Sequence, residues 1–181
     1  SLTSVKKVVD GVEKDTYTID RPEELLGLAN KVNGGTNFDG KVIYLGADID
    51  LNPGFNASTY SYMNSTGTKA TQDWEPIGRR SRDEKVPLFA GTFDGNMHTI
   101  KGVSVRKWSG NVYGLFGQVD GATIKNFILS NSYFYINSGS VTNTYTGSIV
   151  GELNNGTIDS VKCDDTVKIE IGRTNNQYNG G

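Results

Sequence analysis

The sequence predicts an all-β domain in which short coils of chain stack in parallel as a β-solenoid, with an amphipathic helix capping its N-terminal end. Three observations lead to this prediction. Glycine accounts for 23 of the 181 residues, well above the roughly 7% of average proteins, so the chain turns often. Residues 20–33 carry one clear helical pattern. Three later segments repeat a Thr-apolar pair followed by alternating apolar residues.

Length and charge limit the possible classes of protein. With 181 residues the chain can bury a substantial core, so residues 1–181 are expected to form a single domain. The formal charge is −2, from 18 basic and 20 acidic residues, which argues against a nucleic-acid partner. No stretch approaches the roughly 18 apolar residues of a membrane span, so no membrane insertion is expected within this segment.

Neither the start of the chain nor its cysteine content identifies the compartment. The opening stretch "SLTSVKKVVDGVEKD" lacks the apolar core of a signal peptide, so the chain is either cytosolic or separated from its leader. Cys163 is the only cysteine, which excludes an internal disulfide.

A capping helix is expected over residues 20–33. Asp20 is a good N-cap, and Glu23, three residues later, completes a capping box. Gly34 or Gly35 suits the C-terminal end of the helix. The apolar residues follow the i, i+3, i+4, i+7 spacing of one helical face: Leu25, Leu28, Ala29 and Val32.

A strand and a long loop are expected after the helix. The segment "KVIYLGADIDL" has the composition of strands, with Asp48 and Asp50 on one face and apolar residues on the other. From Asn52 to Asp73 the chain is rich in Asn, Ser, Thr and Gly without a sustained period. A loop of that length in a compact domain is either functional or mobile.

Three segments then repeat one pattern: "FAGTFDGNMHTIKGVSV", "GLFGQVDGATIKNFIL" and "SIVGELNNGTIDSVKC". The corresponding pairs are Thr99-Ile100, Thr123-Ile124 and Thr157-Ile158. The alternating apolar positions after them are Val103 and Val105, Phe127 and Leu129, and Val161 and Cys163. Because strand side chains alternate with a period of two, a corner must separate the parts of each copy. Small or turn-tolerant residues lie where the corner would fall: Gly102, Asn126 and Ser160.

Stacking of the copies explains why they occur in series. In parallel coils about 4.8 Å apart, Ile100, Ile124 and Ile158 would form one internal column. Burying about three aliphatic side chains yields ~6 kcal/mol, whereas ordering a coil of about 24 residues costs several times more. A coil is therefore stable only within a stack. The final "QYNGG" resembles the lead-in to earlier copies, so the chain is expected to be a fragment of a longer repeat protein.

Several motifs resemble the GLUG repeat region of bacterial surface proteins: "DWEPIG", "FAGTFDGNMHTIKG", "YGLFGQVDGATIKN" and "GSIVGELNNGTI". The repeats would occupy residues 85–181. Gly114-Leu115-Phe116-Gly117 matches the Gly-Leu-hydrophobic-Gly core, whereas Ser148-Ile149-Val150-Gly151 departs from it at its first two positions. The resemblance implies a right-handed parallel β-helix on an exported, cell-surface protein. Related repeats also occur beside the catalytic domains of secreted peptidases that cleave immunoglobulin A.

The residues that could carry chemistry favour structural roles. His98 is the only histidine and follows a turn, so it is expected to pack there, and Cys163 aligns with core positions. Asp48 and Asp50 share a strand face, which would suit acid-base work or a calcium ion, but the simpler interpretation is a solvated outer face. No catalytic residue, cofactor or metal is therefore predicted.

Aromatic residues in loops are the better candidates for ligand contact. Trp108 lies in a connection between two copies, and Tyr60 and Tyr62 lie in the long loop, where their rings could stack on a sugar or meet a protein. We expect a noncatalytic extracellular adhesion or scaffold module with a host or glycan ligand. The alternatives are an accessory domain of a large secreted peptidase and a polysaccharide-cleaving β-helix enzyme.

Overall fold

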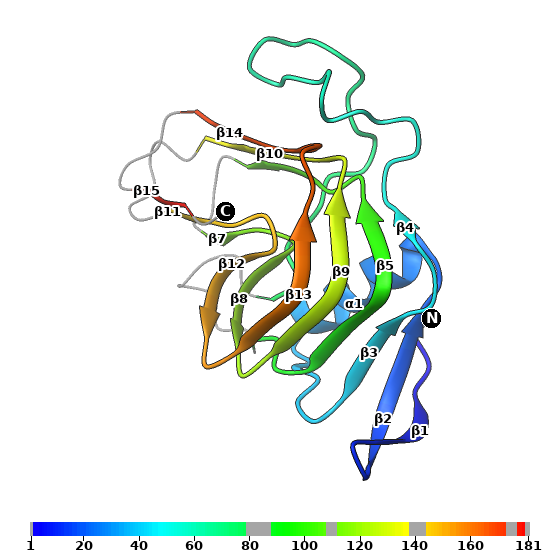
Figure 1. The fold of residues 1–181 in the computed structure, drawn as a ribbon. Coiled ribbons are helices and arrows are strands. Elements are labelled where there is room, and N and C mark those ends of the chain that lie inside the picture. Colours follow the sequence, from blue (N-terminus) through cyan, green and yellow to red (C-terminus); the bar gives the residue numbers. More distant parts are fainter. Residues whose placement is uncertain (1, 79–87, 108–111, 138–143, 173–176, 180–181) are drawn as a thin grey trace.

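The computed structural model describes residues 2–78, 88–107, 112–137, 144–172 and 177–179 of the 181-residue chain. Its described part is mostly β-sheet with mainly parallel pairing, so the all-β prediction is confirmed (Figure 1). The elements are β1 (Val5–Val9), β2 (Val12–Ile19), α1 (Pro22–Asn33), β3 (Val42–Leu45), β4 (Ile49–Asp50), β5 (Thr92–Lys101), β6 (Ser104–Lys107), β7 (Val112–Tyr113), β8 (Phe116–Asp120), β9 (Thr123–Ser130), β10 (Ser132–Ile136), β11 (Thr144–Thr146), β12 (Val150–Asn154), β13 (Thr157–Cys163), β14 (Val167–Ile171) and β15 (Gln177–Asn179).

Four sheets share these strands. The largest has the order β1-β2-β3-β5-β9-β13, with β4 beside β5, and the others are β14-β10-β6, β15-β11-β7 and β12-β8. From β5 onward the chain passes through the sheets in the same order in each round: β5 to β8 and then β9 to β12 pass through all four, and β13 to β15 pass through the first three. Neighbouring strands from successive rounds pair in parallel. Successive rounds therefore lie beside one another throughout the described core (Figure 1).

The predicted register is confirmed for the second and third rounds and wrong for the first. Ile124 pairs with Ile158, as expected. On its other side, however, Ile124 pairs with Phe93, and Ile100 pairs with Leu129. Val105 lies in another sheet, opposite Phe134. The internal column is therefore Phe93, Ile124 and Ile158, and Cys163 belongs with Leu129 and Ile100.

A bulge in β5 causes this misalignment. The pairing of β5 with β9 is interrupted between Asp94 and His98, where the partner strand advances only from Lys125 to Phe127. The ungapped Thr-Ile alignment cannot accommodate this insertion. The corner prediction succeeds at two positions, because Asn126 and Ser160 have φ of 62° and 55°. Gly102 also has a positive φ, but its amide donates to the Asn131 carbonyl. It therefore corresponds to the corner between β9 and β10 rather than to Asn126.

Helix α1 begins and ends close to the predicted bounds but is capped differently. The N-cap residue is Arg21, without a side-chain cap, so the assignment to Asp20 is wrong. The Glu24 carboxylate, rather than that of Glu23, accepts hydrogen bonds from the Asp20 amide at 2.9 Å and the Arg21 guanidinium at 3.0 Å. The four predicted apolar residues of the helix are all buried, and Gly34 follows its last turn. The pattern of buried positions was therefore easier to predict than the local polar contacts.

The helix joins the same core as the sheets. Its C-terminal Asn33 donates from Nδ2 to the Pro76 carbonyl and accepts from the Gly78 amide, each at 3.0 Å. These bonds hold Ile77 beside Phe116, the first residue of β8. Inside, edge and tilted aromatic contacts connect Phe38, Phe89, Phe116, Phe93 and Phe127.

The inner side chains of the third round are partly open to solvent. Ile158, Leu153 and Ile169 are 43%, 37% and 38% exposed, whereas their partners Ile124, Val119 and Phe134 in the second round are fully buried. The predicted inward direction holds, but a side chain in the outermost round is covered on one side only. Within the described ranges, no helix has the length and apolarity that a membrane crossing requires.

The strands β1 and β2 form an antiparallel hairpin that the sequence analysis left unassigned. Asp10 and Gly11 connect them with φ of 50° and 78°. Two successive positive φ values suit the twist of a two-residue hairpin turn, and an Asp-Gly pair adopts them readily. The Asp10-Gly11 pair is therefore the sequence feature from which this hairpin could have been predicted. Beyond the hairpin, β2 pairs in parallel with β3, which joins it to the largest sheet.

Candidate functional site

The long loop after β4 is anchored by a buried asparagine. Asn52 is 2% exposed, and its Nδ2 donates to the carbonyls of Gln72 at 2.9 Å and Gly102 at 2.6 Å. Its Oδ1 accepts from the Gln72 amide at 2.7 Å and the Thr71 hydroxyl at 3.2 Å. One side chain therefore joins the two ends of the loop and attaches both to the corner after β5.

A second asparagine holds the middle of the loop. The Asn131 side chain accepts from the Ala57 amide at 2.8 Å and donates to the Phe55 carbonyl at 2.7 Å. Asn131 itself has a φ of 40°, a conformation that asparagine tolerates better than most residues. The corner between β9 and β10 thus both turns the chain and binds the loop.

The loop also has an apolar core of its own, built on the outer face of β10. Tyr133 and Tyr135 point away from the main core and pack against buried residues of the loop: Phe55, Ala57, Tyr60 and Ala70. The rings of Tyr60 and Tyr133 meet edge to face, with centroids 5.0 Å apart. The loop therefore has a structural role, because it covers two tyrosines that would otherwise be exposed.

A small polar cluster centred on Glu170 lies beneath the loop. The Glu170 carboxylate accepts hydrogen bonds from the Tyr133 hydroxyl and, at 3.2 Å, from the Ser61 hydroxyl, and it pairs with Lys168 at 2.8 Å. Burial raises the pKa of Glu170, but the hydrogen bonds from Lys168 and Tyr133 outweigh it and hold the pKa below its usual range. Burial, together with the bond to Glu170, raises the pKa of Tyr133.

We expect acid to weaken the attachment of the loop through Glu170. Its pKa is lower in the folded than in the unfolded state, so its stabilising contribution is present above the unfolded value of about 4.3 and is lost as the pH falls through the folded pKa. Urea unfolding between pH 7 and pH 3 should therefore show a smaller acid loss in Glu170→Gln than in the wild type. Equal losses in the two proteins would contradict this role, because the other carboxylates are common to both.

The predicted ligand-binding residues have different surroundings. Tyr60 and Tyr62 line a pocket of 220 Å³ together with Ser65, Gly67 and Lys69. Tyr60 is only 6% exposed, so the expectation of an accessible ring is wrong for this residue. Tyr62 is half-buried, with its ring 4.7 Å from that of Tyr135 and 5.2 Å from the Arg106 guanidinium. Trp108 lies outside the described residues.

The structure separates the roles of Asp48 and Asp50. Asp48 accepts hydrogen bonds from the Thr99 amide at 2.9 Å and from His98 Nδ1 at 3.2 Å, and these bonds lower its pKa. Asp50 accepts from the Asn52 amide at 3.0 Å and lies 3.6 Å from Lys101. Each carboxylate therefore braces a neighbouring segment.

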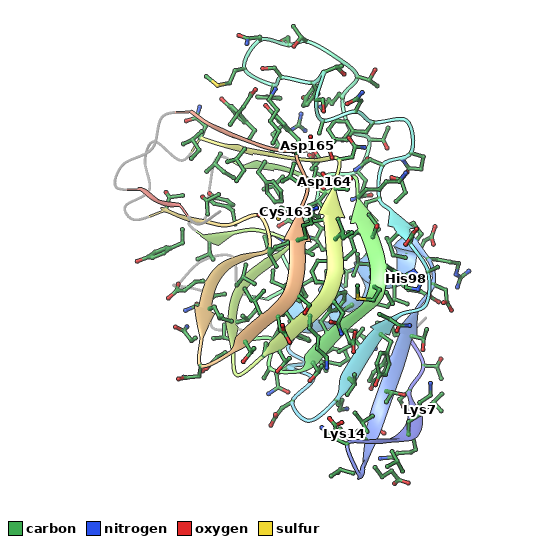
Figure 2. All side chains as sticks on the ribbon, in the orientation of Figure 1. Lys7, Lys14, His98, Cys163, Asp164 and Asp165 are labelled. Atoms are coloured by element: carbon green, nitrogen blue, oxygen red, sulfur yellow. The ribbon has the colours of Figure 1, made fainter. Side chains whose placement is uncertain are left out.

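The remaining reactive side chains lie elsewhere on the fold. Cys163 at the end of β13 is half-buried rather than fully buried, and its Sγ lies 3.1 Å from the Ser148 hydroxyl. Figure 2 shows it beside Asp164 and Asp165, away from His98. Asp164 accepts from the Thr166 amide and hydroxyl, as a turn residue does. Among the described residues, no group of three or more His, Cys, Asp or Glu side chains could hold a metal ion.

Comparisons with known proteins find distant relatives. The chain is 28% identical over 159 residues to "Halomucin" of Haloquadratum walsbyi, covering 87% of this chain and 2% of that protein. It is 27% identical over 164 residues to a "Putative Gly-rich membrane protein" of Evansella cellulosilytica, covering 90% of this chain and 15% of that protein. The chain thus spans a small part of both relatives. No family model matches it. No solved structure matches it significantly.

Proposed function

We propose that this chain is a noncatalytic module of an exported surface protein, serving in adhesion or as a scaffold. The observation that carries the proposal is the ordered return of the chain to the same sheets, four in each of the first two rounds and three in the third. Such stacking supports an extended, rigid face whose outward side chains can vary without disturbing the core. A repeated scaffold of this kind suits presentation of a surface better than assembly of one deep site.

The fold that we propose in full is a right-handed parallel β-helix with α1 as its N-terminal cap. The parallel pairing of β5, β9 and β13 supports the stack, and the contacts of Asn33 with Pro76 and Gly78 support the cap. Of the motifs that resemble the GLUG repeat, residues 89–102 include β5, residues 113–126 include β8 and the start of β9, and residues 147–158 include β12 and the start of β13, whereas residues 73–78 precede β5. Membership in that group of repeats remains part of the proposal.

The names of the two relatives bear on the proposed location. One relative is named a membrane protein and the other a halomucin, and this chain matches only a small part of each. These names support a place at the cell surface within a larger protein. The partner would be a host or glycan ligand, contacted through the outward faces and the long loop.

A combined binding and hydrolysis assay tests this function. The domain, immobilised on beads, is expected to retain mucin or glycans from a mixed panel and to release no product from them. Wild type is compared with Asp48→Asn and Asp50→Asn, which should bind and fold like the wild type. Turnover of any glycan that either substitution abolishes would overturn the noncatalytic proposal and favour a polysaccharide-cleaving enzyme. Absence of both binding and turnover would contradict the adhesion role and leave that of a scaffold.

A further inference from the structure

A groove lies between the β1–β2 hairpin, at the edge of the largest sheet, and the outer face of β3, β5 and β9 in the same sheet. Two adjoining pockets of 370 and 160 Å³ form it, and both are lined by Val9 from the hairpin and Tyr44 from β3. Tyr44 faces outward, because Ile43 and Leu45 on either side of it are fully buried. We call this feature the hairpin groove. None of the residues that the sequence analysis singled out as ligand contacts belongs to it.

The floor of the hairpin groove is built from two rows of outward side chains on β3, β5 and β9. Strand pairing places Tyr44 beside Asp94 and Asp94 beside Lys125. The neighbouring row contains Val42, Thr92 and Thr123. An aromatic ring, two hydroxyl groups and two charged groups therefore share one concave surface.

The wall of the groove contains an unfavourable pair of like charges. Lys7 and Lys14 lie directly opposite each other in the β1–β2 pairing, and they line the larger and smaller pockets respectively. Figure 2 shows both on the hairpin. Like charges at directly opposed positions of an antiparallel pair are destabilising. By contrast, the adjacent pair Lys6 and Asp15, on the other face, forms an ion pair at 2.9 Å.

Carboxylates of the groove do not balance these cations. Asp94 already accepts from the Asn96 amide at 2.9 Å and from Asn126 Nδ2 at 3.0 Å, and it lies 3.8 Å from Lys125. Asp10, the other lining carboxylate, lies exposed at the hairpin turn. The groove thus has three lysines and only two aspartates, and one of these, Asp94, is already engaged by residues of the floor. An anion placed between the hairpin and β9 would relieve the repulsion of Lys7 and Lys14.

We propose that the hairpin groove binds a carboxylate-bearing sugar. In the larger pocket Lys7 Nζ lies over the half-buried Tyr44 ring, 6.0 Å from the ring centroid, and the apolar side of a pyranose would contact this ring beside the lysine. Thr92 and Thr123 supply hydroxyl partners for the sugar, and Lys14 and Lys125 hold its carboxylate. This assignment rests on the proposed binding function and gives it a ligand class and a place.

The test compares acidic sugars with their neutral methyl esters. Tetragalacturonate, a hyaluronan tetrasaccharide and sialyllactose are titrated into the labelled domain, and amide shifts are followed by NMR. At least one acid is expected to shift the amides of Thr92, Asp94 and Thr123, whereas its methyl ester should bind about tenfold more weakly. Hexaglutamate is titrated in parallel as an acidic peptide. Equal binding of acid and ester, stronger binding of the peptide, or no shift at these amides with any acid would overturn the proposal.

Two variants of the same hairpin provide the matched control. Lys14→Glu should abolish acid binding while raising the melting temperature, because it replaces the opposed lysines with an attractive pair. Lys6→Glu makes the same charge change on the other face, and it should lower the melting temperature while leaving binding intact. An equal loss of binding in both variants would indicate an effect of overall charge and would also overturn the assignment of the ligand to the hairpin groove. Binding of mucin that survives Lys14→Glu would leave the adhesion function standing on another surface.

Discussion

Ile124→Asp is expected to prevent stable folding of this domain. Ile124 is fully buried and lies between Phe93 of the first round and Ile158 of the third. An unpaired carboxylate at this position would lose the burial energy of the side chain and place a charge among apolar groups, a combined cost of about 4 kcal/mol or more. That cost is close to the total stability of many domains, about 5–15 kcal/mol. Circular dichroism and urea unfolding measure the effect.

The same strand offers the control. Ile128→Asp makes an identical chemical change at a half-buried, outward position between Phe127 and Leu129, which point inward. Its cost should be below about 1 kcal/mol. Similar unfolding midpoints for Ile124→Asp and Ile128→Asp would refute the inward assignment of this strand face.

Asn52→Ala is expected to release the long loop and to destabilise the domain by about 2–3 kcal/mol. The substitution leaves the carbonyls of Gln72 and Gly102 and the Gln72 amide without their buried partner. Because Asn52 joins both ends of the loop to the corner after β5, the effect should extend to the apolar contacts over β10. Urea unfolding measures the stability, and hydrogen exchange at the Gln72 amide measures the local opening.

Asn64→Ala serves as its control, because Asn64 is an exposed residue of the same loop. This change should alter stability by less than about 0.5 kcal/mol. Unchanged protection of the Gln72 amide in Asn52→Ala would show that Asn52 does not hold the loop.

Local pattern was sufficient for features that depend on periodicity. The buried face of α1 and the pairing of Ile124 with Ile158 followed from helical and strand spacing. The first round was misaligned because the bulge between Asp94 and His98 changes the number of residues without changing the pattern on either side. Contacts between strands stabilise such a bulge, as the hydrogen bond between Asp94 and Asn126 does here. An ungapped alignment of the sequence carries no information about these contacts.

The candidate site was harder to predict than the fold. Tyr60 was expected to be accessible because polar residues surround it in sequence, but Tyr133 and Tyr135 on another element bury it. The ligand contact predicted for Tyr62 stays a prediction; the residue lines a pocket, and its ring lies against Arg106 and Tyr135. The hairpin groove gave no sequence signal, since Tyr44, Lys125 and Lys14 are far apart along the chain.

The sequence by itself determined the strand-rich class, the amphipathic helix and the repeated order of inward residues, because each depends on the spacing of apolar side chains within one segment. Only the tertiary structure decided how the first round aligns, which aromatic rings remain accessible, and that Lys7 faces Lys14 above Tyr44. These features depend on which distant segments meet. Strand pairing and the packing of the loop bring these segments into contact through long-range hydrogen bonds and burial. Local periodicity does not specify such contacts.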